Sequence, residues 1–180
     1  RKFRRGGKNY VYKAGKYSSI NGDCTQMNKN RSFLESLKCA ANGICFALKN
    51  ERNLRFDFSA MLTVAFFGVF CGLNGAEWAV VFLAFAAVIG AELSNTALEN
   101  LCDAVTEKYS EKIGSAKDAA SGAVIFCAIM SAAAGIMIFT SEGRFFRAVS
   151  EIFSNAVYAA VFCVLLVLNA VCLFKNNRKD

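Results

Sequence analysis

Four long apolar runs are the feature that most restricts how this chain can fold. They cover residues 58–76, 78–98, 119–139 and 152–174, and charges are almost absent from them. Each is about as long as the ~20 residues that a helix needs to cross the hydrocarbon core of a bilayer. Because lipid offers the backbone no hydrogen-bond partners, such runs cross a membrane as helices. The sequence therefore predicts an all-α integral membrane protein with a bundle of four transmembrane helices.

A further helix is expected before the first run, over residues 31–50. Apolar side chains recur there at steps of three or four, at Phe33, Leu37, Ala41, Ile44 and Leu48. This spacing is typical of an amphipathic helix, which can lie in the membrane interface or pack on the bundle. The pattern does not decide between the two. Residues 1–30 are basic and rich in Gly, Asn and Ser, which predicts a flexible N-terminal tail.

The charge distribution limits the partners and the chemistry. The formal net charge is +7, and residues 1–55 hold 13 of the 21 Lys and Arg residues. A basic, partly apolar segment suits an anionic membrane surface or a polyphosphate, and no zinc-finger or helix-turn-helix pattern favours nucleic acid. The chain contains no histidine. Proton transfer must therefore use carboxylates, Lys, Tyr or Cys, and His-based metal sites are excluded.

The same charges predict the orientation in the membrane. Four crossings place both termini and the connection 99–118 on one side, and these segments hold all Lys and Arg residues except Arg144 and Arg147. Basic residues flanking transmembrane helices stay in the cytoplasm. We therefore expect both termini and the 99–118 loop to be cytoplasmic.

The second run carries a polar stripe, which we define as Glu92, Asn95, Glu99 and Asp103. At about 100° per residue these four positions share one face of a helix. Counted from Trp78, Glu92 lies roughly 21 Å along the helix, still inside the apolar layer, and Glu99 lies roughly 10 Å further, near the headgroups. A polar loop is expected after it.

Several interpretations of the polar stripe are open from spacing alone. A Glu in a transmembrane helix can join helices, relay ions or serve catalysis, and a polar helix end can simply emerge into water. The charged segment 51–57 has two interpretations as well. It can be a solvated boundary of the first span, or Glu51 can point toward the stripe and help to bind a cation.

Residues 91–123 resemble the signature of the bacterial diacylglycerol kinase and undecaprenol kinase family. The pattern is Glu92, Asn95, Glu99 and Asp103 at steps of three and four, followed by Ala116-Lys117-Asp118. The upstream segment Glu51-Arg52-Asn53-x-Arg55 resembles the entry to the family's first span. The resemblance covers about residues 31–139, as one kinase domain. Residues 140–180, a polar connection over 140–151 followed by the fourth span, are then an additional segment.

The resemblance implies a homotrimer with active sites shared between subunits at the cytoplasmic interface. It implies ATP and Mg²⁺, with Glu92 as the general base for the lipid hydroxyl and Glu51 and Glu99 as Mg²⁺ ligands. The implied nucleotide-binding residues are Arg31, Ser32, Asn95, Lys108, Tyr109, Ser110, Lys117 and Asp118. Asp103, Asn53 and Arg55 are implied as supporting residues. Ser110 stands where the family usually has His.

These observations predict an ATP- and Mg²⁺-dependent lipid kinase of the plasma or inner membrane. The Glu51–Arg55 segment is closer to the undecaprenol kinase branch, so undecaprenol is favoured over diacylglycerol. The alternatives are a non-enzymatic membrane adaptor, in which the polar stripe only packs helices, and a small transporter that uses Glu92 as a proton relay. The fourth span is interpreted as a plain anchor, with padding of the trimer or a partner site as alternatives.

Overall fold

The computed structural model describes residues 3–5, 8–10, 32–105 and 110–174. The chain divides into two units, residues 1–43 and 44–180. In the first unit, β1 (Phe3–Arg5) and β2 (Lys8–Tyr10) pair antiparallel, with Phe3 opposite Tyr10. The expected N-terminal tail did not include this strand pair. The helix α1 (Phe33–Asn50) begins in the first unit and ends in the second, and it confirms the helix expected over 31–50.

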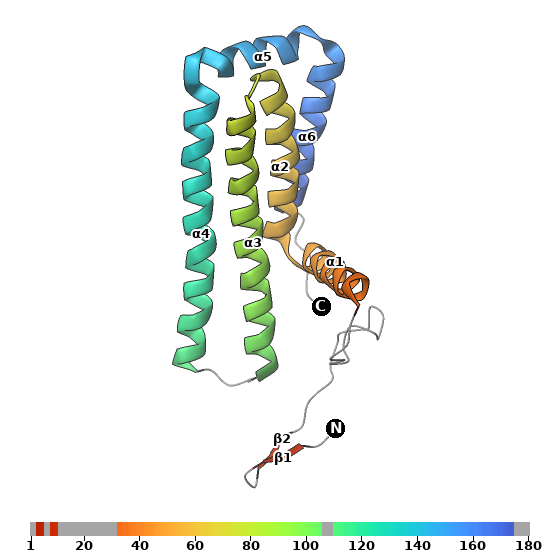
Figure 1. The fold of residues 1–180 in the computed structure, drawn as a ribbon, viewed down its shortest axis with the longest axis vertical. Coiled ribbons are helices and arrows are strands. Elements are labelled where there is room, and N and C mark those ends of the chain that lie inside the picture. The colour runs from red at the N-terminus through yellow and green to blue at the C-terminus, as the bar shows by residue number, and fades with distance from the viewer. Residues whose placement is uncertain (1–2, 6–7, 11–31, 106–109, 175–180) are drawn as a thin grey trace. The chain divides into compact units, whose positions relative to one another are not determined.

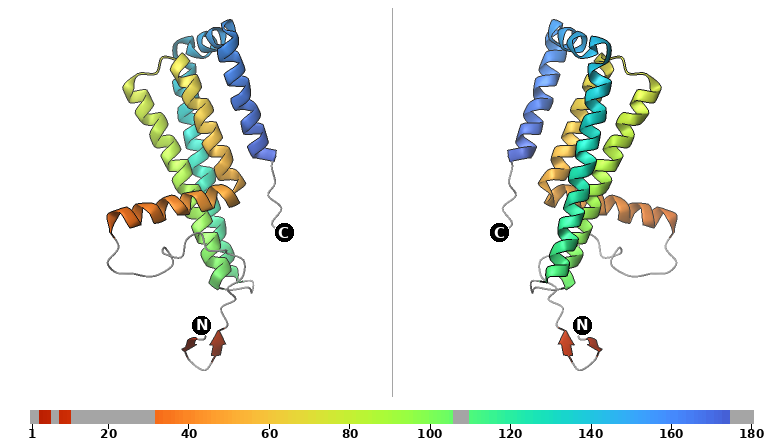
Figure 2. Two further views of the ribbon diagram at one scale, coloured as in Figure 1. Left: turned by 90° about the vertical axis from the view of Figure 1, so that its right-hand side faces the viewer. Right: turned by 90° about the vertical axis from the view of Figure 1, so that its left-hand side faces the viewer.

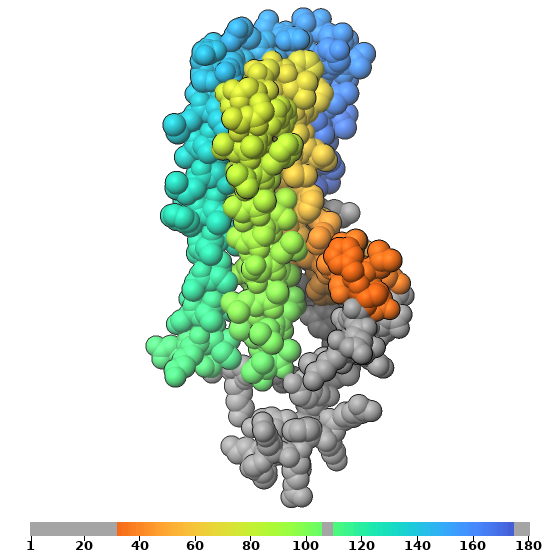
Figure 3. Space-filling model, viewed as in Figure 1, coloured from red at the N-terminus to blue at the C-terminus, as the bar shows by residue number. Residues whose placement is uncertain are grey.

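The second unit is a helical bundle. Its long helices are α2 (Arg52–Phe70), α3 (Gly75–Val105), α4 (Glu111–Thr140) and α6 (Ala156–Phe174). The contacts run in the order α4, α3, α2, α6, and Figures 1 and 2 show this arrangement. In the space-filling view α4, α3 and α2 share one face, and α6 lies largely behind α2 (Figure 3).

The predicted class is confirmed, because four helices in the described ranges are long and apolar enough to cross a membrane. The predicted ends need correction. The first span begins at Arg52 and ends at Phe70, earlier than expected at both ends. The second and third spans continue as helices through the polar segments, to Val105 and from Glu111. The polar loop expected over 99–118 is therefore wrong for most of its length.

The turn between α2 and α3 explains why α2 ends early. Gly72 adopts φ +63°, a left-handed conformation that is cheap only for glycine, and the Leu73 amide donates to the Gly68 carbonyl as in a Schellman motif. Asn74 then caps α3 reciprocally with Glu77: its side chain accepts from the Glu77 amide at 3.0 Å, and the Glu77 carboxylate accepts from the Asn74 amide at 2.8 Å. We call this region, with the residues that cover it, the turn end of the bundle.

Close packing at the turn end also needs a glycine. A Cβ on Gly68 would lie 2.9 Å from the Trp78 ring, so no larger residue fits without displacing the indole. Trp78 stacks on Phe82 at 5.5 Å between ring centroids and joins the core formed around Cys71, Leu73 and Val81. Trp78 therefore packs at least partly into the protein.

A short helix that was not predicted closes the turn end. Residues 140–151 were expected as a polar connection, but α5 (Arg144–Ser154) crosses from α4 to α6, as Figure 1 shows. It follows a 3₁₀ turn, η1 (Ser141–Gly143), in which Glu142 and Gly143 both have positive φ and reverse the chain. Ala148 and Ile152, four residues apart on α5, are fully buried. The helix therefore packs one apolar face onto the bundle.

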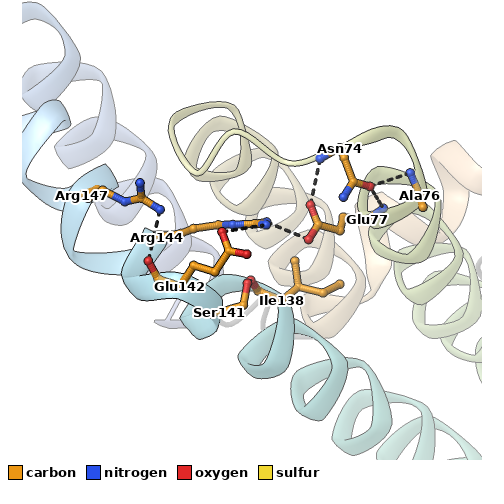
Figure 4. Close-up of polar contacts among 8 residues, drawn as sticks. All are labelled: Asn74, Ala76, Glu77, Ile138, Ser141, Glu142, Arg144 and Arg147. Atoms are coloured by element: carbon orange, nitrogen blue, oxygen red, sulfur yellow. Dashed lines mark hydrogen bonds and ion pairs between the residues drawn. The ribbon is translucent and has the colours of Figure 1, made fainter.

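An ion pair fixes α5 to the start of α3. Arg144 donates to the Glu77 carboxylate at 2.7 Å, and a longer contact of 3.7 Å joins it to Glu142. The Arg144 and Glu77 side chains are only 15% and 20% exposed. Figure 4 shows the guanidinium reaching across to Glu77, whose other oxygen accepts from Asn74. The charges at the turn end are therefore paired and hydrogen-bonded.

Candidate active site at the carboxylate end of the bundle

Glu92 is the most deeply placed carboxylate of the polar stripe. It is only 6% exposed, and it lies on α3 about 26 Å along the helix from Gly75. The Asn53 side chain of α2 hydrogen-bonds to it. Three further carboxylates act on it electrostatically, in decreasing strength Asp57, Glu51 and Glu99. The structure thus brings together four acidic groups from α2 and α3, which we call the carboxylate end.

The junction of α1 and α2 places Glu51. Glu51 is the N-cap of α2, with extended backbone (φ −101°, ψ 122°), and its side chain makes no capping hydrogen bond. Its amide donates to the Ala47 carbonyl at 2.7 Å, so the chain passes directly from one helix to the next. Arg55 donates to the Leu48 and Lys49 carbonyls, both at 3.2 Å, and so caps the end of α1. Arg55 supports the site by holding this junction.

Solvent exposure of the polar stripe increases along α3 from Glu92 to Asp103, as predicted from the positions of these residues along the helix. Asn95 and Glu99 are half-buried and bonded to each other, with the Asn95 amide donating at 3.0 Å. The Ser121 hydroxyl of α4 reaches the Asn95 carbonyl oxygen at 3.5 Å. Asp103, the last member, is 70% exposed. The carboxylates therefore run from a desolvated position at Glu92 to water.

Lys117 lies on α4, opposite the outer part of the stripe. Its ammonium donates to Asp103 at 2.5 Å, and it is also close enough to Glu99 to interact electrostatically. Lys117 and Asp118 were expected in a loop, but both belong to α4. Lys117 faces α3, whereas Asp118 is exposed. The chain thus brings Lys117, but not Asp118, to the stripe.

The remaining predicted residues divide into two sets. Ser32 caps α1: its hydroxyl accepts from the Glu35 amide at 3.3 Å, and the Glu35 carboxylate accepts from the Ser32 amide. Ser110 is the N-cap of α4 and makes no side-chain capping bond. Arg31, Lys108 and Tyr109 lie outside the described residues. The nucleotide contacts expected of all five stay predictions.

Asp57 belongs to the site but was not predicted. Its Oδ2 atom is buried and has no hydrogen-bond partner in the described part of the chain. The interpretation of 51–57 as a charged boundary missed it, because the apolar run begins only at Phe58. The helical repeat was the available signal. Asn53 and Asp57 are four residues apart, so a helix that begins at Arg52 places them on one face.

The acidic side chains of the described residues offer Mg²⁺ only part of a coordination shell. Within residues 32–105 and 110–174, no three acidic or thiol side chains converge closely enough to form a complete metal site. Mg²⁺ is usually held by one or two carboxylates together with substrate phosphates and waters. Glu51 and Glu99 offer two carboxylates without an ion-pair partner among those residues, and Glu99 also lies close enough to Lys117 to interact electrostatically. These residues fit an ion that arrives with a polyphosphate better than a resident ion.

Comparisons with known proteins point to one family. The family model "Prokaryotic diacylglycerol kinase" matches residues 38–139, more than half of the chain. The undecaprenol kinase of Bacillus subtilis (strain 168) is 36% identical over 112 residues, which are 62% of this chain and 91% of that protein. The diacylglycerol kinase of Synechocystis sp. is 33% identical over 105 residues, 58% of this chain and 60% of that protein. No solved structure matches the chain significantly.

The fold and the carboxylate end define a helical membrane protein with an acidic site at the edge of the bilayer. The chain belongs to the prokaryotic diacylglycerol kinase family. The matched residues include α2, α3 and nearly all of α4, and therefore the whole carboxylate end. They leave out α5 and α6.

Proposed function

We propose that this chain is an ATP- and Mg²⁺-dependent lipid kinase that phosphorylates the hydroxyl group of a membrane lipid. The observation that carries the proposal is Glu92, a buried carboxylate in a membrane-crossing helix, with three other carboxylates close enough to act on it electrostatically. Ionisable groups at that depth are costly and are typical of functional sites. Membership of the family, and the names of its kinase relatives, support the same reaction.

The chemistry can be assigned to this chain's own residues. Glu92 accepts the proton of the lipid hydroxyl, and the lipid oxygen forms a bond to the γ-phosphorus of ATP. The bond from that phosphorus to the bridging oxygen breaks, and ADP leaves. Asn53 orients Glu92 through its hydrogen bond, and Lys117 neutralises phosphate charge.

Mg²⁺, when bound with ATP, shields the phosphate oxygens and aligns them. Glu51 and Glu99 are the residues that would hold it, because both act on Glu92 yet neither is paired with a basic residue of the described ranges. Asn95 orients Glu99 by its hydrogen bond at 3.0 Å. A buried base and a wetter ion site thus lie along one helix. The lipid hydroxyl approaches from the bilayer and the nucleotide from water.

Undecaprenol is the proposed acceptor, in preference to diacylglycerol. The Bacillus subtilis relative, named undecaprenol kinase, aligns over 91% of its length, whereas the Synechocystis relative aligns over 60%. The Glu51–Arg55 segment favours the same branch.

The proposed assembly is a homotrimer in the plasma or inner membrane, with both termini and the carboxylate end in the cytoplasm. Two observations support shared sites. Asp118 is exposed in one subunit, and no residue of α4 is buried within it. A neighbouring subunit would cover this helix and bring a second set of side chains to Asp118. The distribution of Lys and Arg supports the orientation.

A micellar kinase assay tests the proposal. The purified chain is mixed with Mg²⁺-ATP and either undecaprenol or diacylglycerol, and labelled phosphate in the lipid is counted. Phosphate transfer to undecaprenol at the higher kcat/KM is the expected result. Transfer to neither lipid would contradict the activity, and preference for diacylglycerol would contradict only the substrate.

A further inference from the structure

The fourth crossing helix is joined to α2 by polar side chains inside the membrane. The Ser59 hydroxyl donates to the Asn169 carbonyl oxygen at 2.7 Å, and the Asn169 amide donates to the Thr63 hydroxyl, also at 2.7 Å. We call these three residues the Asn169 cluster. Ser59 is buried at 4% exposure. Polar side chains that hydrogen-bond across transmembrane helices hold those helices together, so α6 is specifically joined to α2.

The Asn169 amide is fully satisfied by this arrangement. Its second N–H donates to the Leu165 carbonyl at 2.9 Å. Thr63 donates its own hydroxyl to the Ser59 carbonyl and accepts from Asn169, so it uses both functions. A fully bonded polar group at this depth fixes one register between two helices, because sliding either helix would leave amide groups without partners.

The opposite side of α2 carries the site. Asn53 and Asp57 lie roughly 120° to 160° around the helix from Ser59, so one side of α2 meets Glu92 while the other meets α6. Glu51 lies eight residues before Ser59, about 12 Å along the axis. Rotation or sliding of α2 would therefore move Asn53, Asp57 and Glu51 relative to α3.

Aromatic packing alone would not set this register. Phe66 stacks on Phe162 with ring centroids 6.2 Å apart, and Phe70 meets Tyr158 edge-on at 5.1 Å. Ring contacts of this kind tolerate shifts of position. The directional bonds of the Asn169 cluster do not.

We propose that Asn169 is a positioning residue: through Ser59 and Thr63, α6 holds α2 in the rotation and register that place Glu51, Asn53 and Asp57 against Glu92. This extends the family's site to a helix outside the matched residues 38–139. The expected effect on nucleotide binding rests on the proposed function. The expected effect on the rotation and register of α2 is independent of it.

The test compares Asn169→Leu and Thr63→Val with Thr140→Val in the full chain in micelles. Thr63 and Thr140 each donate to the carbonyl four residues earlier, but only Thr63 also accepts from Asn169. Thr140→Val is thus a matched control. Three quantities are measured: amide hydrogen exchange over residues 51–57, binding of Mg²⁺ with a non-hydrolysable ATP analogue, and kcat and KM for ATP.

We expect Asn169→Leu and Thr63→Val to speed exchange over residues 51–57 and to weaken binding of the ATP analogue by roughly 3- to 10-fold, the loss expected for one hydrogen bond. KM for ATP should rise by a similar factor while kcat changes less. The melting temperature of both variants should also fall, because each substitution leaves buried polar groups without a partner, and the control should match wild type throughout. Thr63→Val alone carries the test if Asn169→Leu does not fold.

Two results would overturn the proposal. One is wild-type exchange over residues 51–57 in both variants. The other is a fall in melting temperature with unchanged affinity for the ATP analogue, which is the behaviour of a plain anchor. If wild-type protein binds no nucleotide and phosphorylates neither lipid, the proposed function fails, and the exchange measurement still decides the role of Asn169.

Discussion

The two ends of the bundle treat carboxylates in opposite ways. At the turn end, Glu77 is bonded to Arg144 at 2.7 Å and to the Asn74 amide at 2.8 Å, so its charge is balanced and its oxygens are occupied. At the carboxylate end, Asp57, Glu51 and Glu99 all act electrostatically on Glu92, and in the described ranges none of these four carboxylates has an ion-pair partner.

The difference separates structural charge from functional charge. A paired carboxylate needs nothing more and holds elements together, whereas clustered like charges destabilise the fold unless a cation or protons arrive. The turn end uses its charge to dock α5. The carboxylate end keeps an unbalanced charge that a positively charged ligand would balance. Substitutions at the carboxylate end should therefore affect catalytic activity, and substitutions at the turn end should affect stability.

The largest effect on activity is expected for Glu92→Gln. The amide keeps the size of the side chain but cannot accept the proton of the lipid hydroxyl, so kcat should fall by at least ~100-fold, the usual contribution of a general base. Lipid phosphorylation in micelles measures it. The proposed trimer and the melting temperature should be retained, because the substitution removes one of several repelling charges. Full activity would rule out Glu92 as the base.

Glu99→Gln should have the next largest effect, because it weakens the proposed Mg²⁺ contact while Asn95 can still bond to the amide. We expect kcat/KM at fixed Mg²⁺ to fall by roughly 10- to 100-fold. Activity should recover partly at higher Mg²⁺, and a titration of rate against Mg²⁺ shows this. A rate that is lower by one constant factor at every Mg²⁺ concentration would argue against Glu99 as a ligand.

A smaller effect is expected at the Lys117–Asp103 pair. Lys117→Met should raise KM for ATP several-fold, because it removes the cation near the phosphates. Asp103→Asn weakens the bond that restrains Lys117 but keeps the ammonium, so KM for ATP should change less. Equal effects of the two substitutions would mean that the pair is structural, like Arg144 with Glu77.

The crossing helices show how much of the fold could be predicted from sequence. Their existence follows from length and apolarity alone, so all four were predicted. The ends of these helices were not predicted correctly. Polar residues such as Asn100 and Asp103 can continue a helix when a neighbouring helix packs beside them. The α3 and α4 helices, 31 and 30 residues long, extend together beyond the span expected for a bilayer. That extension depends on contacts between α3 and α4, and such contacts cannot be predicted from the sequence of either helix alone.

The site divides in the same way. Glu92, Asn95, Glu99 and Asp103 could be grouped because they lie on one helix, and their burial decreases in the predicted order. Asp57 could not be found without knowing that α2 begins at Arg52, and the Asn169 cluster joins residues more than a hundred positions apart. Helix α5 was missed because Arg144 and Arg147 suggested a polar connection. In the fold Arg144 meets Glu77 and the apolar face turns inward.

The smallest effect on activity is expected at the turn end. Arg144→Met leaves Glu77 without its cation in a site where that carboxylate is only 20% exposed. The melting temperature should fall, and Glu77→Gln with Arg144→Met together should recover part of the loss, because the unpaired charge is then gone. The kcat and KM values for both substrates should stay at wild-type levels, since α5 meets the bundle at the end away from Glu92. Circular dichroism on heating and the micellar assay measure the two quantities on the same preparations. A loss of kcat without a loss of stability would mean that the turn end is coupled to the site, and the division between structural and functional charge would then be wrong.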